Sequence, residues 1–294
     1  MLKKLFFLQV IVFLGSQGFA FADNKTEEVL QKLREDCKQL LLKTYKHENS
    51  FVRAAVMRAA GESHDPGLIH LLEKGIEDYY PTARLFALQG LKQVSKTAAL
   101  SAARKLTNDH DIWVRSAAVE ILGDEGGSEV LEEIRGYLKS YDVPMKLAAA
   151  AGLVKLGKTS YLEGVLDPLT HPIPDRRYQA IGHLGKIGSK EVIPHLVKLL
   201  DHSEPEMIFY SLKAIEGKAT IEMLPKLRKL SKHKTPSIRH AAAMAMSNIP
   251  EAEVDLIPLC ADKDGMTKLS AAVALNRIGS DSCQIVFEEL LGHE

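Results

Sequence analysis

A motif of basic, small and apolar residues recurs along the chain with the spacing of an α-helix. Each copy has a reference position, here numbered 0, with apolar or small residues at −1, +3, +7 and +10. These positions fall on one helical face, so each motif predicts one amphipathic helix. Six successive spacings of position 0 are 31 residues and the last is 29. Position 0 is occupied by Arg53, Arg84, Arg115, Lys146, Arg177, Ile208, Arg239 and Lys268.

A second, shorter helical segment lies between successive motifs, as over 67–74, 129–138, 191–200 and 253–260. Gly, Pro, Asp and Asn mark the turns, and no run alternates apolar and polar residues as a strand does. The sequence therefore predicts an all-α chain of about eight 31-residue helix pairs. A single pair cannot bury its apolar face, so the pairs are expected to stack into an α-solenoid.

The two ends of the repeat region differ from the repeats between them. A longer, more charged helix is expected over 27–45, and a last helix without a partner over 282–291. Both are predicted to be capping helices, because the terminal repeats of a solenoid need a polar outer face.

The motif resembles the HEAT-like repeats of the phycobilisome-lyase (PBS lyase) type. The resemblance is carried by V-R-x-A-A, as in Val114-Arg115-Ser116-Ala117-Ala118, and by L-G, as in Leu122-Gly123, and it covers roughly residues 25–294. It implies a HEAT-like solenoid. It implies no single activity, because the same repeat serves in scaffolds, bilin lyases and deoxyhypusine hydroxylase.

Residues 1–22 have the features of a secretory signal peptide. Lys3 and Lys4 precede an apolar run, and Ala20 and Ala22 supply the small residues that a signal peptidase reads. We therefore expect cleavage after Ala22 and a periplasmic or secreted protein. An uncleaved membrane anchor is the alternative, but ten core apolar residues are few for a span, so no stable membrane insertion is expected after cleavage.

The remaining chain, 23–294, is predicted to be a single solenoid domain of balanced charge. The full sequence has 38 basic and 38 acidic residues, and removing 1–22 leaves 36 against 38. Since no basic excess is available to displace counterions, we expect no nucleic-acid partner. Aromatic residues are scarce: 13 of the 18 remain after Ala22.

The three cysteines are too few and too scattered for a disulfide framework. In the repeat register Cys283 aligns with Val254 of the preceding repeat, and Cys260 lies six residues further on. That offset is about 9 Å along a helix axis. Adding roughly 8–10 Å between helices takes Cys260 and Cys283 beyond disulfide reach. Both, together with Cys37, are expected to be buried thiols.

A second column of residues stands six positions before position 0, at the end of the first helix of each pair. It contains His47, Asp78, Asp109, Ser140, His171, His202, His233 and Asp262. The resemblance implies that Asp in this column and Arg at position 0 form a ladder between repeats. The expected ladder residues are Asp78, Arg84, Asp109, Arg115, Arg177 and Arg239.

The histidines of this column have two interpretations. His171, His202 and His233 can cap carbonyls at helix ends, where a cation also favours the helix dipole. Alternatively they form a metal or proton ladder, but repeats spaced by about 10 Å do not let three imidazoles share one metal. We favour capping and expect no metal site and no cofactor.

The residues support neither of the two enzymatic activities that the resemblance brings to mind. Deoxyhypusine hydroxylase needs several facing His-Glu dyads, whereas this chain has His47-Glu48 and His293-Glu294 near opposite ends. No nucleophile–base set and no phosphate-binding loop is apparent. We therefore expect a non-enzyme. The alternative is an enzyme or chaperone-like relative of the bilin lyases or of the HEAT-repeat metal-dependent hydroxylases.

The second helix of each pair is expected to line the concave face of the solenoid. Positions −1, +2, +3, +6, +7 and +10 fall in the buried arc, and +1, +5 and +8 face outward. Several outward residues are apolar, and Gly182 and Gly185 predict a shallow recess beside Tyr178. The predicted partner-binding residues are Leu85, Leu147, Tyr178, Phe209, Lys213, His240, Met244 and Leu269.

Two outcomes remain open for these side chains: an exposed apolar groove, or burial against neighbouring repeats in a tightly wound solenoid. With the groove exposed, the chain is an exported interaction scaffold or adaptor that binds a protein or peptide on its concave face.

Overall fold

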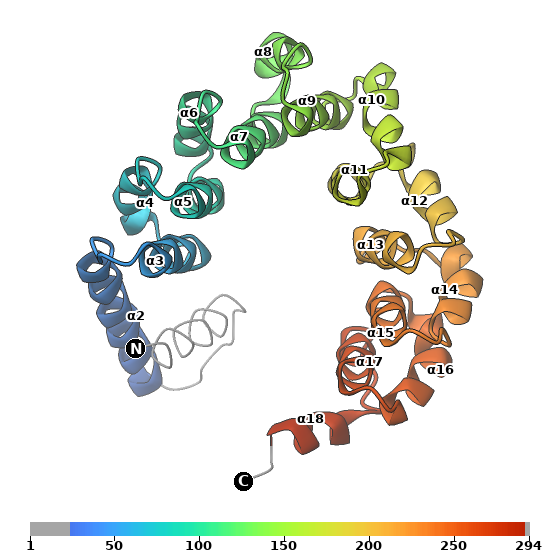
Figure 1. The fold of residues 1–294 in the computed structure, drawn as a ribbon. Coiled ribbons are helices and arrows are strands. Elements are labelled where there is room, and N and C mark those ends of the chain that lie inside the picture. Colours follow the sequence, from blue (N-terminus) through green and yellow to red (C-terminus); the bar gives the residue numbers. More distant parts are fainter. Residues whose placement is uncertain (1–23, 292–294) are drawn as a thin grey trace. The chain divides into compact units, whose positions relative to one another are not determined.

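The structure is a computed structural model that describes residues 24–291. All regular secondary structure in this range is helical (Figure 1). This agrees with the all-α solenoid that the apolar pattern predicts. The chain divides into unit 1, which ends at Gly157, and unit 2, which begins at Lys158. The expectation of one uninterrupted solenoid across this boundary stays a prediction.

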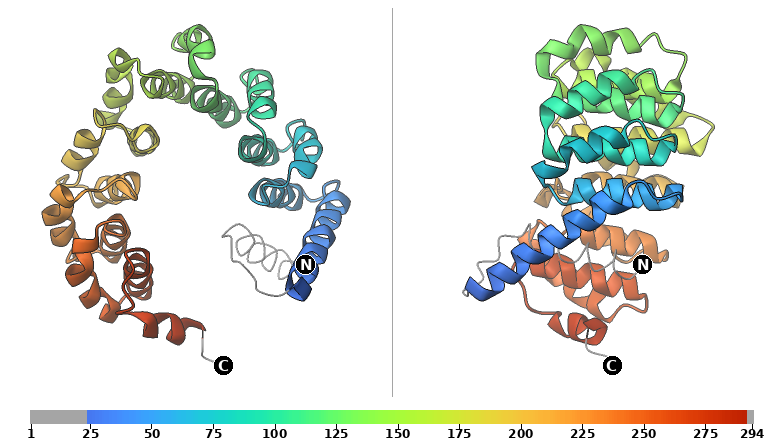
Figure 2. Two further views of the ribbon diagram at one scale, coloured as in Figure 1. Left: turned by 180° about the vertical axis from the view of Figure 1, so that it is seen from behind. Right: turned by 90° about the vertical axis from the view of Figure 1, so that its left-hand side faces the viewer.

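Unit 1 consists of two rows of helices, seen from two further sides in Figure 2. Helices α2, α4, α6 and α8 form a first-helix row, and α3, α5, α7 and α9 form a second-helix row that contains the motifs. The elements are α2 (Asn24–Thr44), α3 (Ser50–Glu62), η1 (Pro66–Leu68), α4 (Ile69–Gly75), α5 (Pro81–Val94), α6 (Lys96–Leu106), α7 (Ile112–Glu125), η2 (Gly127–Val130), α8 (Leu131–Tyr137) and α9 (Val143–Lys155).

Unit 2 repeats the same two-row arrangement and ends in one further helix. Its first helices are interrupted by 3₁₀ turns. The elements are η3 (Thr159–Tyr161), α10 (Glu163–Leu166), η4 (Asp167–Thr170), α11 (Pro174–Ile187), α12 (Ile193–Leu199), α13 (Pro205–Ile215), η5 (Ile221–Met223), α14 (Leu224–Leu230), α15 (Pro236–Ala245), η6 (Pro250–Ala252), α16 (Glu253–Leu256), η7 (Ile257–Ala261), α17 (Gly265–Arg277) and α18 (Gln284–Leu291).

The ends of the second helices follow from local sequence. Proline at the first position of α5, α11, α13 and α15 loses no intrahelical hydrogen bond there and presets the backbone angle φ. At the other end, Gly188 adopts a φ of 60°, a left-handed conformation that stops α11 at low steric cost.

The core of each unit is the stripe that the motif predicts. In all eight repeats the residues at +3 and +7 are at most 1% exposed. Those at +3 are Val56, Ala87, Ala118, Ala149, Ala180, Ser211, Ala242 and Ala271. Because most are alanine, neighbouring second helices pack closely, and leucine at +7 fills the remaining space.

Glycine lets neighbouring second helices of unit 1 touch backbone to backbone in two pairs. A Cβ atom added to Gly61 would lie 2.4 Å from the Cα of Gly90, and one added to Gly123 would lie 2.6 Å from the Cα of Gly152. These contacts join α3 to α5 and α7 to α9. Since Gly61 and Gly123 occupy +8, that position faces the next repeat, and the prediction that +8 faces outward is wrong there.

The predicted recess beside Tyr178 is also absent at one of its two glycines. Gly185 is buried, and a Cβ atom added to it would lie 2.9 Å from the Cα of Ala214 in the next repeat. Gly182, by contrast, is exposed, with nothing within 4 Å of an added Cβ atom. Gly185 is therefore a packing contact between α11 and α13.

The prediction for the cysteines is wrong. Cys260 and Cys283 form a disulfide with their Cα atoms 6.1 Å apart. The register argument placed Cys283 inside a helix parallel to the preceding one, but α18 begins only at Gln284, so Cys283 lies in the turn before it. Cys260 and the unbridged Cys37 are half-buried rather than buried. The disulfide ties α18 to the last repeat.

Across residues 24–291, none of the helices combines the length and the apolar character needed to cross a bilayer. The predicted signal segment, 1–22, lies outside the described residues.

Glycine-to-alanine substitutions will separate backbone packing from helix propensity. Gly123→Ala places a methyl group against Gly152, so we expect the free energy of unfolding to fall by roughly 1–3 kcal/mol. Gly182→Ala, also inside a helix but in open space, is expected to raise it by roughly 0.5–1 kcal/mol. Urea denaturation followed by circular dichroism measures both. A stabilised Gly123→Ala variant would contradict the close contact.

Candidate functional site

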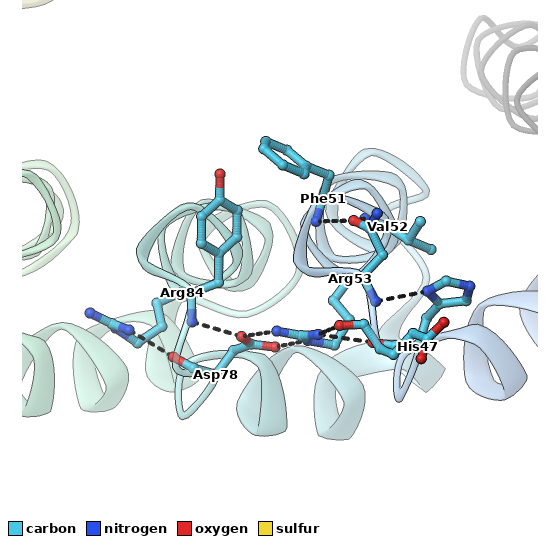
Figure 3. A network of polar contacts seen from close by, with 9 residues as sticks. His47, Phe51, Val52, Arg53, Asp78 and Arg84 are labelled. Carbon is cyan, nitrogen blue, oxygen red and sulfur yellow. Dashed lines mark hydrogen bonds and ion pairs between the residues drawn. The ribbon is translucent and has the colours of Figure 1, made fainter.

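An arginine ladder joins the helix pairs at the turn before each second helix. In the step shown in Figure 3, Arg53 Nε donates to Asp78 Oδ2 at 2.6 Å and Nη2 donates to Oδ1 at 3.0 Å. Arg53 Nη1 donates to the carbonyls of His47 and Glu48 in its own repeat. One guanidinium therefore binds carbonyls of the turn after its own first helix and the carboxylate of the next repeat.

The same arrangement recurs in both units. Each arginine at position 0 donates to the backbone carbonyl six residues earlier and pairs with an acid of the following repeat. The ion pairs are Arg53–Asp78, Arg84–Asp109 and Arg115–Asp142 in unit 1, and Arg177–Glu204 and Arg239–Asp262 in unit 2. The six residues expected to form a ladder all lie in it.

Two acids of the ladder were missed because they stand outside the −6 column. Position −6 holds Ser140 and His202 in these repeats, and neither is a carboxylate. The acid is instead supplied two residues later, by Asp142 to Arg115 and by Glu204 to Arg177. In both repeats an acid stands at −4 where −6 lacks one, and this was the available sequence signal.

The −6 side chains also fix the turn that follows. Asp78 Oδ1 accepts from the N–H of Tyr80, two residues on, and the imidazole Nδ1 of His171 accepts from the N–H of Ile173 in the same way. His47, His202 and His233 each accept equivalently. These histidines therefore cap backbone N–H groups, not the carbonyls that the sequence suggested.

No metal cluster appears among the described residues 24–291: nowhere do three His, Cys, Asp or Glu side chains come together as potential ligands. Of the two His-Glu dyads, His47-Glu48 belongs to a ladder turn, and His293-Glu294 lies outside the described residues.

Three carboxylates of the ladder, those of Asp78, Asp109 and Asp262, are held in the ionised form. Burial alone would raise the pKa of Asp78 and of Asp109, but hydrogen bonds from the arginine and from a backbone N–H lower each pKa below its usual value of 3.8. For Asp262 the hydrogen bond from Arg239 is the largest effect, and the pKa is again lowered. The turns are therefore rigid and internally neutralised at physiological pH.

A group of four rings, here called the ring stack, lies on the second-helix row of unit 2. It consists of Tyr178 on α11, Phe209 and Tyr210 on α13, and His240 on α15. Tyr178 and Tyr210 stack with centroids 4.5 Å apart, and Phe209 stacks on His240 at 5.8 Å with planes 3° apart. Phe209 meets Tyr210 edge to face at 5.4 Å.

The ring stack is partly open to solvent. Tyr178, Phe209 and His240 are half-buried, and Tyr210 is 40% exposed. Burial lowers the pKa of His240, whose Nδ1 has no hydrogen-bond partner among the described residues. Beside the stack, Lys213 is exposed, whereas Met244 and Leu269 are half-buried. Six of the eight predicted binding residues are thus accessible on one face of unit 2.

The two remaining predicted binding residues lie in unit 1, and one of them is unsuitable. Leu85 is half-buried, but Leu147 is only 3% exposed. Helices α7 and α9 are drawn together at Gly123 and Gly152, and Ser116 Oγ donates to the carbonyl of Pro144 across the same contact. This close approach accounts for the burial of Leu147, so its prediction as an exposed residue is wrong.

Tyr210 is not among the predicted binding residues, because position +2 falls in the arc that helical periodicity assigns to the core. Its ring instead bridges Tyr178 and Phe209, and this is the contact that joins the stack across repeats. The succession Phe209-Tyr210 next to Tyr178 one repeat earlier was the available signal.

Removal of one ladder arginine should be costly, because it leaves a buried carboxylate unpaired. Arg84 and Asp109 are 10% and 7% exposed as side chains, so Arg84→Gln is expected to lower the free energy of unfolding by roughly 3–5 kcal/mol. Arg104 pairs with Glu133 of the next repeat, but there the two side chains are 51% and 29% exposed, so no buried carboxylate is left behind. Arg104→Gln should therefore cost at most about 1 kcal/mol. Equal effects in chemical denaturation would contradict the ladder's role.

Comparison with known proteins agrees with this architecture. Residues 69–153 match a family model for HEAT repeats, and 176–202 match one for the PBS lyase HEAT-like repeat. No curated protein sequence matches the chain significantly.

Several solved structures are similar to the chain at low sequence identity. Human deoxyhypusine hydroxylase is 18% identical, with 86% of this chain and 98% of that one covered and a TM-score of 0.41. The complex of CpcE and CpcF of phycocyanin lyase from Nostoc sp. PCC7120 is 19% identical, with 75% and 92% covered and a TM-score of 0.47. Importin beta is 14% identical, with 97% and 47% covered and a TM-score of 0.41. The matched repeats therefore identify the chain as a HEAT-like repeat protein of the PBS lyase type.

Proposed function

We propose that this protein is an exported interaction scaffold that binds a polypeptide partner through the ring stack on the second-helix face of unit 2. The observation that carries the proposal is the partial exposure of Tyr178, Phe209, Tyr210 and His240 on three successive helices. A fold whose core consists of alanine and leucine has no packing need for four rings on its surface. Aromatic side chains that are preorganised and half-desolvated are typical anchors of protein interfaces.

The surroundings of the ring stack indicate the chemistry of the partner. Lys213 is exposed on α13, and Arg277 is half-exposed on α17, where it pairs with Glu216 across two repeats. Met244 and Leu269 extend the apolar surface. Lys213 also pairs with Glu216, and the exposed Glu206 lies near Tyr178, so these charges balance. A helix or extended segment with one apolar side matches this surface.

Export is supported by two independent features. The sequence of residues 1–22 has the basic start, apolar run and small-residue cleavage site of a signal peptide. The disulfide between Cys260 and Cys283 joins α18 to the last repeat, and structural disulfides persist mainly in oxidising compartments.

The ring stack is tested by affinity capture with wild-type protein and two matched variants. Phe209→Asp places a charge inside the stack, and we expect it to abolish capture of the polypeptide that wild-type protein retains. Val254→Asp is the control, because Val254 is 70% exposed on α16, in the first-helix row of the same unit. Far-UV circular dichroism establishes that both variants fold. Equal capture by all three proteins would exclude the ring stack as the binding surface.

Export and oxidation are tested on the protein isolated from its own host. The mature chain is expected to begin at Asp23, as read by N-terminal sequencing. Thiol titration of the denatured protein should find one reactive cysteine, Cys37, before reduction and three afterwards. A chain that begins at Met1 and has three reactive thiols would be a cytosolic protein, contrary to the proposal.

A further inference from the structure

His240 is the only imidazole of the ring stack, and it stands at position +1 of its motif. The other seven repeats have no histidine at this position, where they carry Ala54, Leu85, Ser116, Leu147, Tyr178, Phe209 and Leu269. Histidine is the side chain whose ordinary pKa places its change of charge close to neutral pH. The ring stack therefore contains one group that can gain a positive charge under mildly acidic conditions.

The imidazole of His240 is part of a continuous series of ring contacts. It stacks on Phe209 with centroids 5.8 Å apart and planes 3° apart. Phe209 meets Tyr210 edge to face at 5.4 Å, and Tyr210 stacks on Tyr178 at 4.5 Å. Phe209 is thus the link between His240 and the two tyrosines, so a movement of the imidazole away from Phe209 changes the surface that the four rings form together.

The stacked position suits the neutral imidazole and not the cation. Nδ1 of His240 is shielded from solvent and has no hydrogen-bond partner among the described residues. In the neutral ring, with its hydrogen on Nε2, Nδ1 is an acceptor that lacks a donor. In the protonated ring both nitrogens are donors, so Nδ1 carries a buried N–H and part of a positive charge with nothing to accept it.

The carboxylates nearest to the imidazole are already engaged by other groups. Glu216, at the end of α13, pairs with Lys213 and Arg277, and Asp264 caps the first turn of α17. Burial is the largest influence on the pKa of His240 and lowers it. Asp264 and Glu216 raise this pKa and Lys213 lowers it, and the net result is a value below the ordinary 6.5.

The other charges around α15 do not act on the imidazole. Arg239, its neighbour in the chain, pairs with Asp262 of the ladder. Helix α14 also packs on α15, and its charged residues are likewise not among those that influence His240. They are Lys226, which pairs with Asp201, Arg228, which pairs with Asp255, and the exposed Lys229.

Burial of Nδ1 couples protonation to the geometry of the ring stack. In the closed form the imidazole lies on Phe209, and in an open form it is turned so that Nδ1 reaches water. The closed form binds a proton more weakly than the open form does. Above pH 6.5 the closed form therefore keeps its full advantage, and as the pH falls below this value the advantage decreases by up to about tenfold per pH unit.

We propose that His240 is a pH switch of the ring stack: near neutral pH the uncharged imidazole closes on Phe209, and in mild acid its protonation parts the two rings and releases the bound polypeptide. This inference rests on the proposed function of the ring stack and adds a condition under which binding ends. It assigns His240 a positioning role, because the imidazole acts by holding the ring of Phe209 in place.

Opening of the stack is tested without a partner, by NMR titration of the full mature protein between pH 8 and pH 5. His240→Phe keeps a ring on Phe209 but cannot titrate, and it identifies the His240 resonance among the 11 histidines. We expect that resonance to titrate with a midpoint below 6.5. The ring resonances that Tyr210→Phe removes should move with the same midpoint in the wild-type protein and stay fixed in His240→Phe.

The control variant for the titration is His70→Phe. His70 lies on α4 of unit 1 with a side chain that is 78% exposed, so its removal should leave the movement of the Tyr210 resonances unchanged. A midpoint of 6.5 or above for His240 would overturn the proposal. So would Tyr210 resonances that do not follow the titration of His240.

Release is tested with the polypeptide that the immobilised wild-type protein captures at pH 7.5. A change to pH 5.5 should weaken its binding by about tenfold on the wild-type protein and leave it unchanged on His240→Phe. Equal binding by the two proteins at pH 5.5 would overturn the switch while leaving the ring stack as the binding surface. Undiminished capture by Phe209→Asp at pH 7.5 would instead overturn the proposed function, and release with it, whereas the NMR titration decides the opening of the stack independently.

Discussion

Most of this architecture depends on one repeated hydrogen-bonding group, the guanidinium at position 0. The turn after each first helix has a backbone carbonyl at position −6, and an acid of the next repeat lies near the arginine at position 0. Arginine binds both: Arg84, for example, donates to the carbonyl of Asp78 and, through two bonds, to Asp109 of the next repeat. Where position 0 is arginine, one turn is thereby fixed to the next, which is the nearest-neighbour coupling that a repeat protein needs.

The acid of the ladder can come from either of two positions. When the −6 residue is Ser140 or His202, the acid moves to Asp142 or Glu204, and the guanidinium of Arg115 or Arg177 reaches it from the same position. Whatever its type, the −6 side chain also caps the following turn, because Asp, Ser and His can all accept from the N–H two residues later. A column of mixed residue types thus has one structural role.

Packing between second helices introduces a longer period on top of the 31-residue repeat. Small residues at +8 and +6 draw α3 to α5, α7 to α9 and α11 to α13, whereas Lys92 at +8 of α5 instead forms an ion pair with Asp124. The exposed rings of Phe51 and Trp113, 62 residues apart, follow the same two-repeat period. Aromatic rings of the described residues are thus concentrated on surfaces, and alanine and leucine form most of the core, because closely packed helices leave little room for aromatic side chains.

Periodicity in the sequence determined the fold class and the buried stripe, since each depends on spacing within one helix or on a column repeated in register. The family resemblance added most residues of the ladder, but not Asp142 and Glu204. Tertiary structure decided which residues meet. Tyr210 lies in the arc that a lone helix would bury, yet it joins Tyr178 to Phe209; Leu147 lies in the outward arc, yet it is covered. Cys283 reaches Cys260 because it lies in the turn before α18, which begins two residues later than expected. Such contacts arise from the distance and angle between helices, which residue spacing along one helix does not encode.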